Sequence, residues 1–431
     1  MVKKVKRKTI SLIFIIQIML ILIISNSQFF ASTSASSNNI TAVEPGQSIQ
    51  EAINNAADGQ TILIKKGQYD IEYAIIVNKT VTLVGEQTNE TIIDGQATAT
   101  LILSILANEA KIQNLTVRNC ATYGYGIHIK NAIKVKIQNC NIQNCSKGVI
   151  LTNSTNCELS RNLIADSKEY GIYFPTNSSY NLVFWNNIKN NSQAVTIGNI
   201  NCKNNTFYQN NFIQNPTQTS GFGIPNNLWD NEYPAGGNYW SSYTGIDVKN
   251  GPQQNETGSD GIGDESYELY LTAEDHYPLM GPVHWFLAHQ METSSEYYVL
   301  VSSNVSEASN FHYGCPDESS ISFTLTGNLN GFCRVAISQQ LLSGDGDSWL
   351  VTIGTEETER TVMLDTNYTY ICFAHNYSTT KTVKIQGDYC VPEFSSSNML
   401  LFLAITIIAL VILKTAKTNA ITSHRKRFQK A

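Results

Sequence analysis

Between Gly126 and Phe174 the chain reads GIHIKNAIKVKIQNCNIQNCSKGVILTNSTNCELSRNLIADSKEYGIYF, and one short pattern returns in it at a nearly constant interval. A glycine, an apolar residue, a variable residue and a second apolar residue begin at Gly126, Gly148 and Gly171, and Ala194 opens a fourth copy. Successive copies therefore start 22, 23 and 23 residues apart. A fixed period of this length is typical of stacked structural repeats.

Two further classes of residue keep the same period. The alternation within each copy is that of a short strand with one buried face, and the Asn, Ser and Gly residues between copies favour turns. Strands this short bury little alone, so they must stack turn upon turn. We therefore predict a right-handed parallel β-helix, in which Ile127, Val149, Ile172 and Val195 form one column. The second apolar column is Val117, Ile142, Ile164, Ile188 and Phe212, and the polar column is Asn131, Asn153, Asn177 and Asn199.

The glycines and asparagines of the repeat are expected at its corners. A glycine that opens each copy suits a tight corner with a positive φ. Asparagine tolerates the left-handed region, and its amide can bond to the next asparagine in a ladder.

This pattern resembles the parallel β-helix repeat family, in particular NosD-type β-helix proteins and their archaeal surface relatives. Residues 44–69 resemble the opening of that family, with a capping helix from about Ser48 to Ala57. Ser48 and Glu51 have the spacing of a capping box. A helix at this end would cover strand edges that the first turn leaves unpaired.

The two ends of the chain predict export and membrane attachment. Residues 1–35 have a basic start, an apolar run over 10–24 and small residues afterwards, which indicates a secretory signal that is cleaved or retained as an anchor. Residues 399–413 form an apolar run that precedes a basic tail. The run is shorter than the ~17–25 residues of most spanning helices, but its terminal place favours a transmembrane helix over a buried one. We expect a single-pass cell-surface protein with a cytoplasmic tail.

Composition agrees with an extracellular location. Charged residues make up 15% of the chain, against ~25% in average proteins, so no nucleic-acid partner is expected. Asn-x-Ser/Thr sequons recur, for example at Asn78, Asn89 and Asn255, and permit glycosylation, although an Asn-rich solenoid also makes sequons by accident. Five cysteines in the coil (Cys120, Cys140, Cys145, Cys157 and Cys202) are expected as buried small residues, and Cys315, Cys333, Cys372 and Cys390 as two disulfides of unknown pairing.

The predicted fold is all-β, and the chain divides into five regions. After residue 283 the repeat vanishes, and seven short strand-like runs, the first at 297–302 and the last at 382–385, favour a β-sandwich stalk. The regions are a signal peptide (1–35), a capping helix with the first β-helix turns (40–110), the main parallel β-helix with its closing segment (111–282), the β-sandwich (283–392), and a transmembrane helix with its tail (393–431).

One outer face of the coil is a candidate carbohydrate-binding surface. The residue between the two buried positions of each copy points outward, and it is His128 in the first copy and Tyr173 in the third. Tyr125 and Tyr170 precede their glycines and are expected to flank the same face. Aromatic side chains on a polar solenoid can stack on sugar rings, although ordinary surface aromatics would give the same pattern.

The segment that closes the coil is a candidate calcium site. Asp260 and Asp264 lie in the acidic glycine-rich run GSDGIGD, with Asp247 and Asp275 nearby, and hard cations use such flexible oxygen-rich loops. An acidic glycine turn without a metal explains the run equally well. NosD-type relatives suggest copper, but the coil between residues 111 and 216 offers only His128 and no methionine, so the copper role does not carry over.

Catalysis is the weaker interpretation. Between residues 111 and 216 the only acids are Glu158, Asp166 and Glu169, whereas glycoside hydrolases need paired carboxylates. We predict a non-catalytic surface protein that binds carbohydrate or other envelope components. The alternatives are a polysaccharide lyase or hydrolase using Asp94, Asp166 or Arg161, and a NosD-like copper accessory protein.

Overall fold

The computed structural model describes residues 40–290, 296–304, 307–315, 317–327, 331–377 and 379–390. They form two compact units that interleave in sequence. The first holds the described residues up to Asn231 together with Gly236–Thr244 and Ser266–Pro278, and the second holds Glu232–Ala235, Gly245–Glu265 and the described residues from Leu279 onward. The predicted signal (1–35) and transmembrane segment (393–431) lie outside the described residues. Within the described ranges, no helix has both the length and the apolar character needed to cross a membrane.

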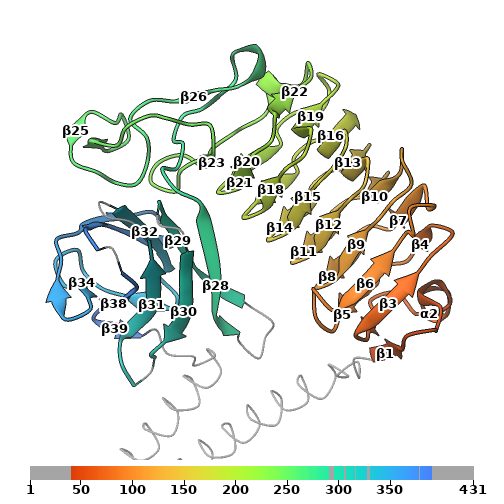
Figure 1. Ribbon diagram of the computed structural model, residues 1–431, viewed down its shortest axis with the longest axis horizontal. Helices are drawn as coiled ribbons and strands as arrows, with labels where there is room; N and C mark the ends of the chain where they lie inside the picture. Colours follow the sequence, from red (N-terminus) through yellow and green to blue (C-terminus); the bar gives the residue numbers. More distant parts are fainter. Residues whose placement is uncertain are drawn as a thin grey trace, which may run out of the picture. The chain divides into compact units, whose positions relative to one another are not determined.

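The first unit is a coil of three parallel sheets, and each complete turn contributes one strand to each sheet (Figure 1). The first sheet contains β1 (Ile40–Val43), β2 (Thr61–Ile64), β5 (Thr82–Gly85), β8 (Lys111–Gln113), β11 (Lys136–Gln138), β14 (Glu158–Ser160), β17 (Leu182–Phe184) and β20 (Thr206–Tyr208). The second contains β3 (Gly67–Asp70), β6 (Thr91–Asp94), β9 (Thr116–Arg118), β12 (Asn141–Gln143), β15 (Leu163–Ala165), β18 (Asn187–Lys189), β21 (Asn211–Ile213) and β23 (Tyr239–Trp240). The third contains β4 (Ile75–Val77), β7 (Leu101–Ile105), β10 (Tyr125–Lys130), β13 (Lys147–Thr152), β16 (Tyr170–Thr176), β19 (Gln193–Ile197) and β22 (Thr217–Ser220).

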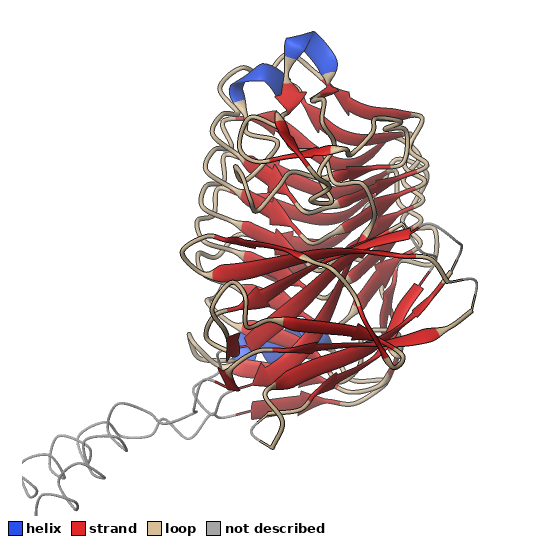
Figure 2. Cartoon of the chain, turned by 90° about the vertical axis from the view of Figure 1, so that its left-hand side faces the viewer, coloured by secondary structure: helices blue, strands red, loops and turns tan. Residues whose placement is uncertain are grey.

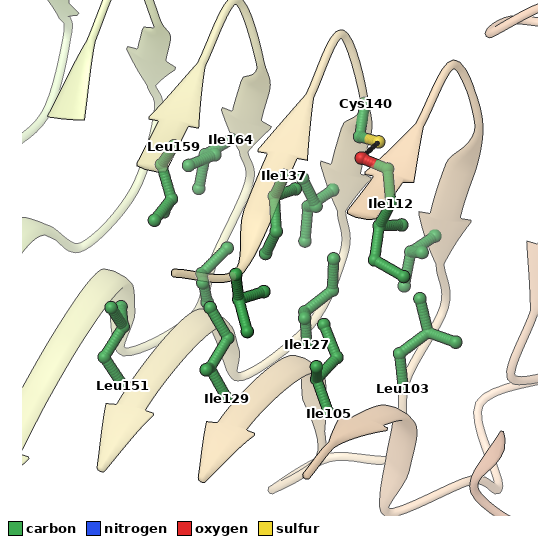
Figure 3. Packing of buried hydrophobic residues seen from close by; sticks show 14 of the residues in the cluster. Leu103, Ile105, Ile112, Ile127, Ile129, Ile137, Cys140, Leu151, Leu159 and Ile164 are labelled. Carbon is green, nitrogen blue, oxygen red and sulfur yellow. Dashed lines mark hydrogen bonds between the residues drawn. The ribbon is translucent and has the colours of Figure 1, made fainter. Parts of the chain in front are cut away.

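The predicted apolar columns are confirmed. Ile127 pairs in register with Val149, Val149 with Ile172, and Ile172 with Val195. All four side chains are fully buried. The second column, from Val117 to Phe212, is likewise in register along the second sheet. Figure 3 shows such side chains from neighbouring turns filling one continuous interior.

The glycines that open each copy have a different role from the predicted one. Gly126, Gly148 and Gly171 do not have positive φ angles. A Cβ atom at Gly126 would instead lie 2.7 Å from the carbonyl oxygen of Gly148, and one at Gly148 would lie 2.6 Å from that of Gly171. Close approach of successive turns therefore excludes a side chain here, and the prediction of a left-handed corner was wrong.

The predicted corner column of asparagines is confirmed only in part, and further asparagine ladders lie inside the coil. Asn131, Asn153 and Asn177 have φ between 43° and 53°, and Asn153 Nδ2 donates to Asn131 Oδ1 at 3.0 Å. Asn199 is not among the left-handed residues. Three further ladders are buried, and in each the side-chain oxygen accepts a main-chain N–H of the preceding turn. Their asparagines are 162, 186, 210 and 238; 181, 205 and 227; and 191 and 215.

Both ends of the coil are closed. Helix α2 (Ile49–Asn55) begins at Ser48, whose side chain accepts the N–H of Glu51 at 3.2 Å, so the predicted capping helix is confirmed. At the other end, Trp240 stacks on Phe212 and Trp229 on Phe207, with ring centroids 4.1 and 4.3 Å apart. These tryptophans extend the inner columns by one step. The remaining elements of this end are η1 (Ile224–Asn226), β26 (Tyr267–Glu268), η2 (Tyr270–Thr272) and β27 (Glu274–Asp275). Figure 2 shows that helices form only a small part of the described chain.

The second unit consists mainly of two five-stranded antiparallel sheets that share one core. One sheet has the order β28 (Val283–Gln290), β29 (Glu296–Ser303), β32 (Gly331–Ser338), β37 (Tyr368–His375) and β36 (Thr361–Leu364). The other has the order β30 (Glu307–Tyr313), β31 (Ser320–Thr326), β38 (Lys381–Gln386), β34 (Leu350–Ile353) and β35 (Glu356–Glu357). Two small pairs join β24 (Lys249–Asn250) to β25 (Glu256–Thr257) and β33 (Leu342–Ser343) to β39 (Tyr389–Cys390). Strands β28 and β30 were not predicted.

The cysteine predictions are confirmed only in part. Cys120 and Cys145 form a disulfide between neighbouring turns, with Cα atoms 4.8 Å apart, so the prediction of unpaired coil cysteines was wrong for these two. Cys315 and Cys390 form the other disulfide. Cys333 and Cys372 are free and buried rather than bridged, as are Cys140, Cys157 and Cys202.

Candidate functional site

The four residues predicted to bind carbohydrate lie on the outer face of the third sheet. Tyr125 on β10 and Tyr170 on β16 both pair with Lys147 on β13, the strand between them. His128 and Tyr173 occupy a second outward row on the same strands, with Ile150 between them. We call Tyr125, His128, Lys147, Tyr170 and Tyr173 the aromatic strip.

Lys147 organises the aromatic strip. Its ammonium lies over the rings of Tyr125 and Tyr170, 5.0 and 5.6 Å from their centroids, which is cation–π geometry. It also forms an ion pair with Glu169 at 2.8 Å, while Ser146 Oγ donates to the other oxygen of Glu169 at 2.6 Å. The hydrogen bond from Lys147 is the largest influence on Glu169 and lowers the pKa of that carboxyl group.

The remaining members of the aromatic strip are held by their neighbours. Tyr170 and Tyr173 stack with ring centroids 4.7 Å apart and planes at 30°. His128 Nε2 lies 2.9 Å from Thr152 Oγ1, and its ring meets that of Tyr125 edge-on at 6.3 Å. Burial, followed by the charge of Lys130, lowers the pKa of His128. The face is therefore an ordered set of rings, hydroxyl groups and one paired ammonium.

The face continues along the coil as polar side chains. Thr196 follows Tyr173 in register, and Ser220 follows Thr196. Their hydroxyl oxygens are 2.8 Å apart, and both lie within hydrogen-bond distance of Gln193 Oε1.

Sequence reasoning missed Lys147 and Glu169. Lys147 stands immediately before Gly148, in the position that Tyr125 and Tyr170 hold before their own glycines. This position before the glycine indicates that Lys147 belongs to the same face. It was not predicted because only aromatic residues were considered as sugar ligands.

A groove runs along the corner between the second and third sheets. Its lining includes Asp94 from an early turn and Asp166 and Lys168 from a later one. Asp166 and the corner residues Asn119 and Asn144 have φ between 53° and 59°, so Asp166 takes the corner position that asparagine holds in the earlier turns. The full lining is Asp94, Gln96, Ala97, Asn119, Cys120, Asn144, Asp166 and Lys168.

The acids of the alternative enzyme hypothesis are not a close pair. Strands β6 and β15, which precede the corners of Asp94 and Asp166, are separated by three strand spacings of ~4.8 Å, or roughly 14 Å, whereas paired glycosidase carboxylates lie ~5–10 Å apart. Asp94 Oδ2 instead accepts hydrogen bonds from Arg118 Nε at 2.8 Å and Asn119 Nδ2 at 2.9 Å. Arg161 follows β14 on the left-handed corner between the first and second sheets, a different corner from that of Asp166.

Three of the predicted calcium ligands lie in the loops of the second unit. Asp247 accepts hydrogen bonds from Ser259 Oγ and from the N–H groups of Asp260 and Gly261 at 2.6–3.1 Å. Burial raises the pKa of Asp247 to about 6. Asp264 Oδ1 accepts the N–H groups of residues 248 and 249, both at 3.1 Å.

Asp275, the fourth predicted ligand, belongs to the first unit. It is fully buried, and its carboxylate accepts hydrogen bonds from Trp240 Nε1 at 2.8 Å and from the main chain of Asn238 and Tyr277. In the part of the chain that the structure describes, no three His, Cys, Asp or Glu residues form a group suited to a metal ion. Calcium binding stays a prediction.

A family model described as "Right handed beta helix region" matches residues 101–252, and no curated protein matches the chain. Among solved structures, pectin methylesterase from carrot is 12% identical, with 48% of this chain and 72% of that chain covered and a TM-score of 0.32. Escherichia coli ybhc is 12% identical, with 46% and 70% covered and a TM-score of 0.31.

A third solved structure, the PL6 family alginate lyase AlyGC, is 13% identical, with 43% of this chain and 35% of that chain covered and a TM-score of 0.28. Likenesses this distant carry no argument about activity. The family match agrees with the stacked parallel sheets and their columns, and the first unit is therefore a parallel β-helix built from repeated turns.

Proposed function

We propose that this chain is a non-catalytic, membrane-anchored surface protein whose aromatic strip binds carbohydrate. The observation that carries the proposal is the register of the third sheet, which gathers Tyr125, His128, Tyr170 and Tyr173 on one outer face. Tyrosine combines an apolar ring with a hydroxyl group, and this combination suits the apolar faces and hydroxyl groups of sugars.

The scaffold supports recognition of an extended ligand. The aromatic strip stands on strands rather than loops, and rigid elements hold a binding constellation more accurately. The Lys147 ammonium and the stacking of Tyr170 on Tyr173 fix the rings before a ligand arrives, which reduces the ordering cost of binding.

The test is binding of the purified full-length protein to a panel of cell-envelope and plant polysaccharides. We expect Tyr125→Ala and Tyr173→Ala each to weaken binding by about tenfold, since an interface anchor contributes ~1–2 kcal/mol. Tyr180→Ala is the matched control, because Tyr180 is 56% exposed at another corner of the coil. Binding to no polymer, or equal losses in all three variants, would reject the aromatic strip as the binding surface.

A second candidate is a polysaccharide lyase or hydrolase at the corner groove. The observation in its favour is that Asp94, Asp166 and Lys168 line one groove. Turnover of a polyuronate or glucan, abolished by Asp166→Asn, would replace the non-catalytic proposal. Full turnover in both Asp166→Asn and Asp94→Asn would remove these residues from any such site.

A further inference from the structure

We infer that the aromatic strip takes an uncharged polysaccharide in preference to a polyuronate, and that Glu169 imposes this preference by occupying Lys147. The inference rests on the proposed function, since it names the class of glycan that the same face would bind. It assigns to Glu169 the role of a specificity-determining residue, although Glu169 is not one of the four residues predicted to bind carbohydrate.

The cation of the aromatic strip is already satisfied by the protein. Lys147 has one carboxylate partner at 2.8 Å and two aromatic rings beneath its ammonium, and its side chain is only 14% exposed. Glu169 is in turn fixed by Ser146 at 2.6 Å. A ligand carboxylate that approached Lys147 would have to displace Glu169 or lie beside it, and two neighbouring carboxylates repel each other.

The rest of the face offers uncharged hydrogen-bonding groups. His128 is half-buried, and its lowered pKa favours the neutral ring. Beyond Tyr173, the outward positions hold Thr196, which is buried, and the half-buried Ser220 and Gln193. Hydroxyl and amide groups of this kind pair with sugar hydroxyls and provide no compensation for a buried ligand charge.

Two exposed cations border the face. Lys130 ends β10, and Lys168 lines the corner groove together with Asp166. Because both are solvent-exposed, their attraction for a ligand carboxylate is screened at physiological salt. They do not replace the more enclosed ammonium of Lys147, which Glu169 neutralises.

The dimensions suit a chain laid along the coil axis. From β10 to β22 the face crosses five strands of the third sheet, so it is four spacings of ~4.8 Å, or roughly 19 Å, long. A sugar ring in an extended glycan is about as long as one such spacing, so we expect affinity to rise with chain length until the oligosaccharide covers these strands.

The experiment compares uncharged and polyuronate oligosaccharides of equal length, titrated into the full-length protein at physiological salt. We expect the uncharged series to bind at least tenfold more tightly. Glu169→Gln removes the competing charge and should strengthen polyuronate binding at least fivefold. The double variant Glu169→Gln with Lys147→Met should lose this gain, because the gain requires the freed ammonium.

Glu158→Gln is the matched control, since Glu158 forms the same kind of pair with Lys136, at 2.9 Å, on the first sheet. It removes the same charge and should leave selectivity unchanged. Tighter binding of polyuronates by the unmodified protein, no gain in Glu169→Gln, or an equal gain in Glu158→Gln would each overturn the inference while leaving carbohydrate binding intact. Binding of neither series would instead overturn the proposed function itself.

Discussion

The main-chain N–H of Asn238 donates to Oδ2 of Asp275 at 2.7 Å, inside the closed end of the coil. This bond is the last step of a buried ladder, in which Asn186 accepts from Asn162, Asn210 from Asn186 and Asn238 from Asn210. At each step a side-chain oxygen takes the N–H of the turn before it. Asp275 supplies that oxygen where no further turn exists, and it also accepts from Trp240.

We therefore predict that Asp275→Asn destabilises the first unit. One carboxylate oxygen of Asp275 would become an NH₂ group, which cannot accept the N–H groups that now donate to it. A buried polar group left without a partner costs ~1–3 kcal/mol. Urea unfolding followed by tryptophan fluorescence measures the loss. Glu274→Gln is the control, because Glu274 is only half-buried and bonds Ser266. Equal stability of the two variants would contradict a capping role for Asp275.

The same carboxyl group makes stability depend on pH. Burial raises the pKa of Asp275 to about 7 from a usual value of 3.8, so the folded state holds this proton more tightly than the unfolded state. The stabilisation is complete below pH ~4 and is lost as pH rises toward 7, by up to about 4 kcal/mol. The hydrogen bond from Lys147 lowers the pKa of Glu169. The stabilisation that Glu169 contributes is therefore lost as pH falls, in a more acidic range.

Urea titrations between pH 4 and 8 test this expectation, with unfolding of the first unit followed as before. The free energy of unfolding should fall across that range, and the slope should flatten in Asp275→Asn. A rise in stability from pH 4 to 7 in the unmodified protein would refute the assignment.

The sequence predicted the coil because the buried columns carry its period directly. Ile127, Val149 and Ile172 are one turn apart in sequence and adjacent in space. The aromatic strip was predictable in part for the same reason, since strand alternation decides which residues point outward. The Lys147–Glu169 pair was not, because it depends on how long side chains meet across neighbouring turns.

Other features gave ambiguous signals. Adjacent asparagines such as Asn186 and Asn187 do not reveal which of the two points inward, and the structure buries only Asn186 completely. The 25-residue separation of Cys120 and Cys145 equals about one turn, yet the same spacing would also stack free thiols. In the second unit, β28 lacks strict alternation, as VHWFLAHQ shows, and its strand character depends on pairing with β29.

The difference between those asparagines is itself testable. Asn186 Oδ1 accepts the N–H of Asn162, and its Nδ2 donates to the carbonyl of Leu159 at 2.8 Å. Asn186→Ala should cost ~2–4 kcal/mol, because two buried main-chain groups lose their partners. Asn187→Ala removes one half-buried side-chain bond, to Asn211, and should cost less than ~1 kcal/mol. If urea unfolding showed similar losses of stability for the two variants, the buried ladder would contribute no more than a half-buried side-chain bond.

The apolar columns should respond in the same selective way. Ile137 is fully buried on β11, while its neighbour Lys136 points outward and pairs with Glu158 at 2.9 Å. Ile137→Ala is expected to cost ~2–5 kcal/mol through lost burial and a residual cavity, and Lys136→Ala at most ~1 kcal/mol. Thermal and urea unfolding both report the difference. If Ile137→Ala lowered the free energy of unfolding by less than ~1 kcal/mol, the interior would have to collapse around the missing methyl and methylene groups.

Thiol counting tests the disulfide pattern. With two bridges among nine cysteines, alkylation of the denatured, non-reduced protein should label five thiols, whereas reduction should expose all nine. Peptide mapping should recover Cys120 linked to Cys145 and Cys315 linked to Cys390.

Because the Cys120–Cys145 bridge closes a loop of 25 residues, Cys120→Ser with Cys145→Ser should lower the free energy of unfolding by roughly 3 kcal/mol. The pair Cys140→Ser with Cys157→Ser is the control for the labelling, since those thiols are free and their loss should reduce the count from five to three. A bridge between Cys333 and Cys372 in the peptide map would contradict this pattern, because both are buried as free thiols on paired strands, β32 and β37.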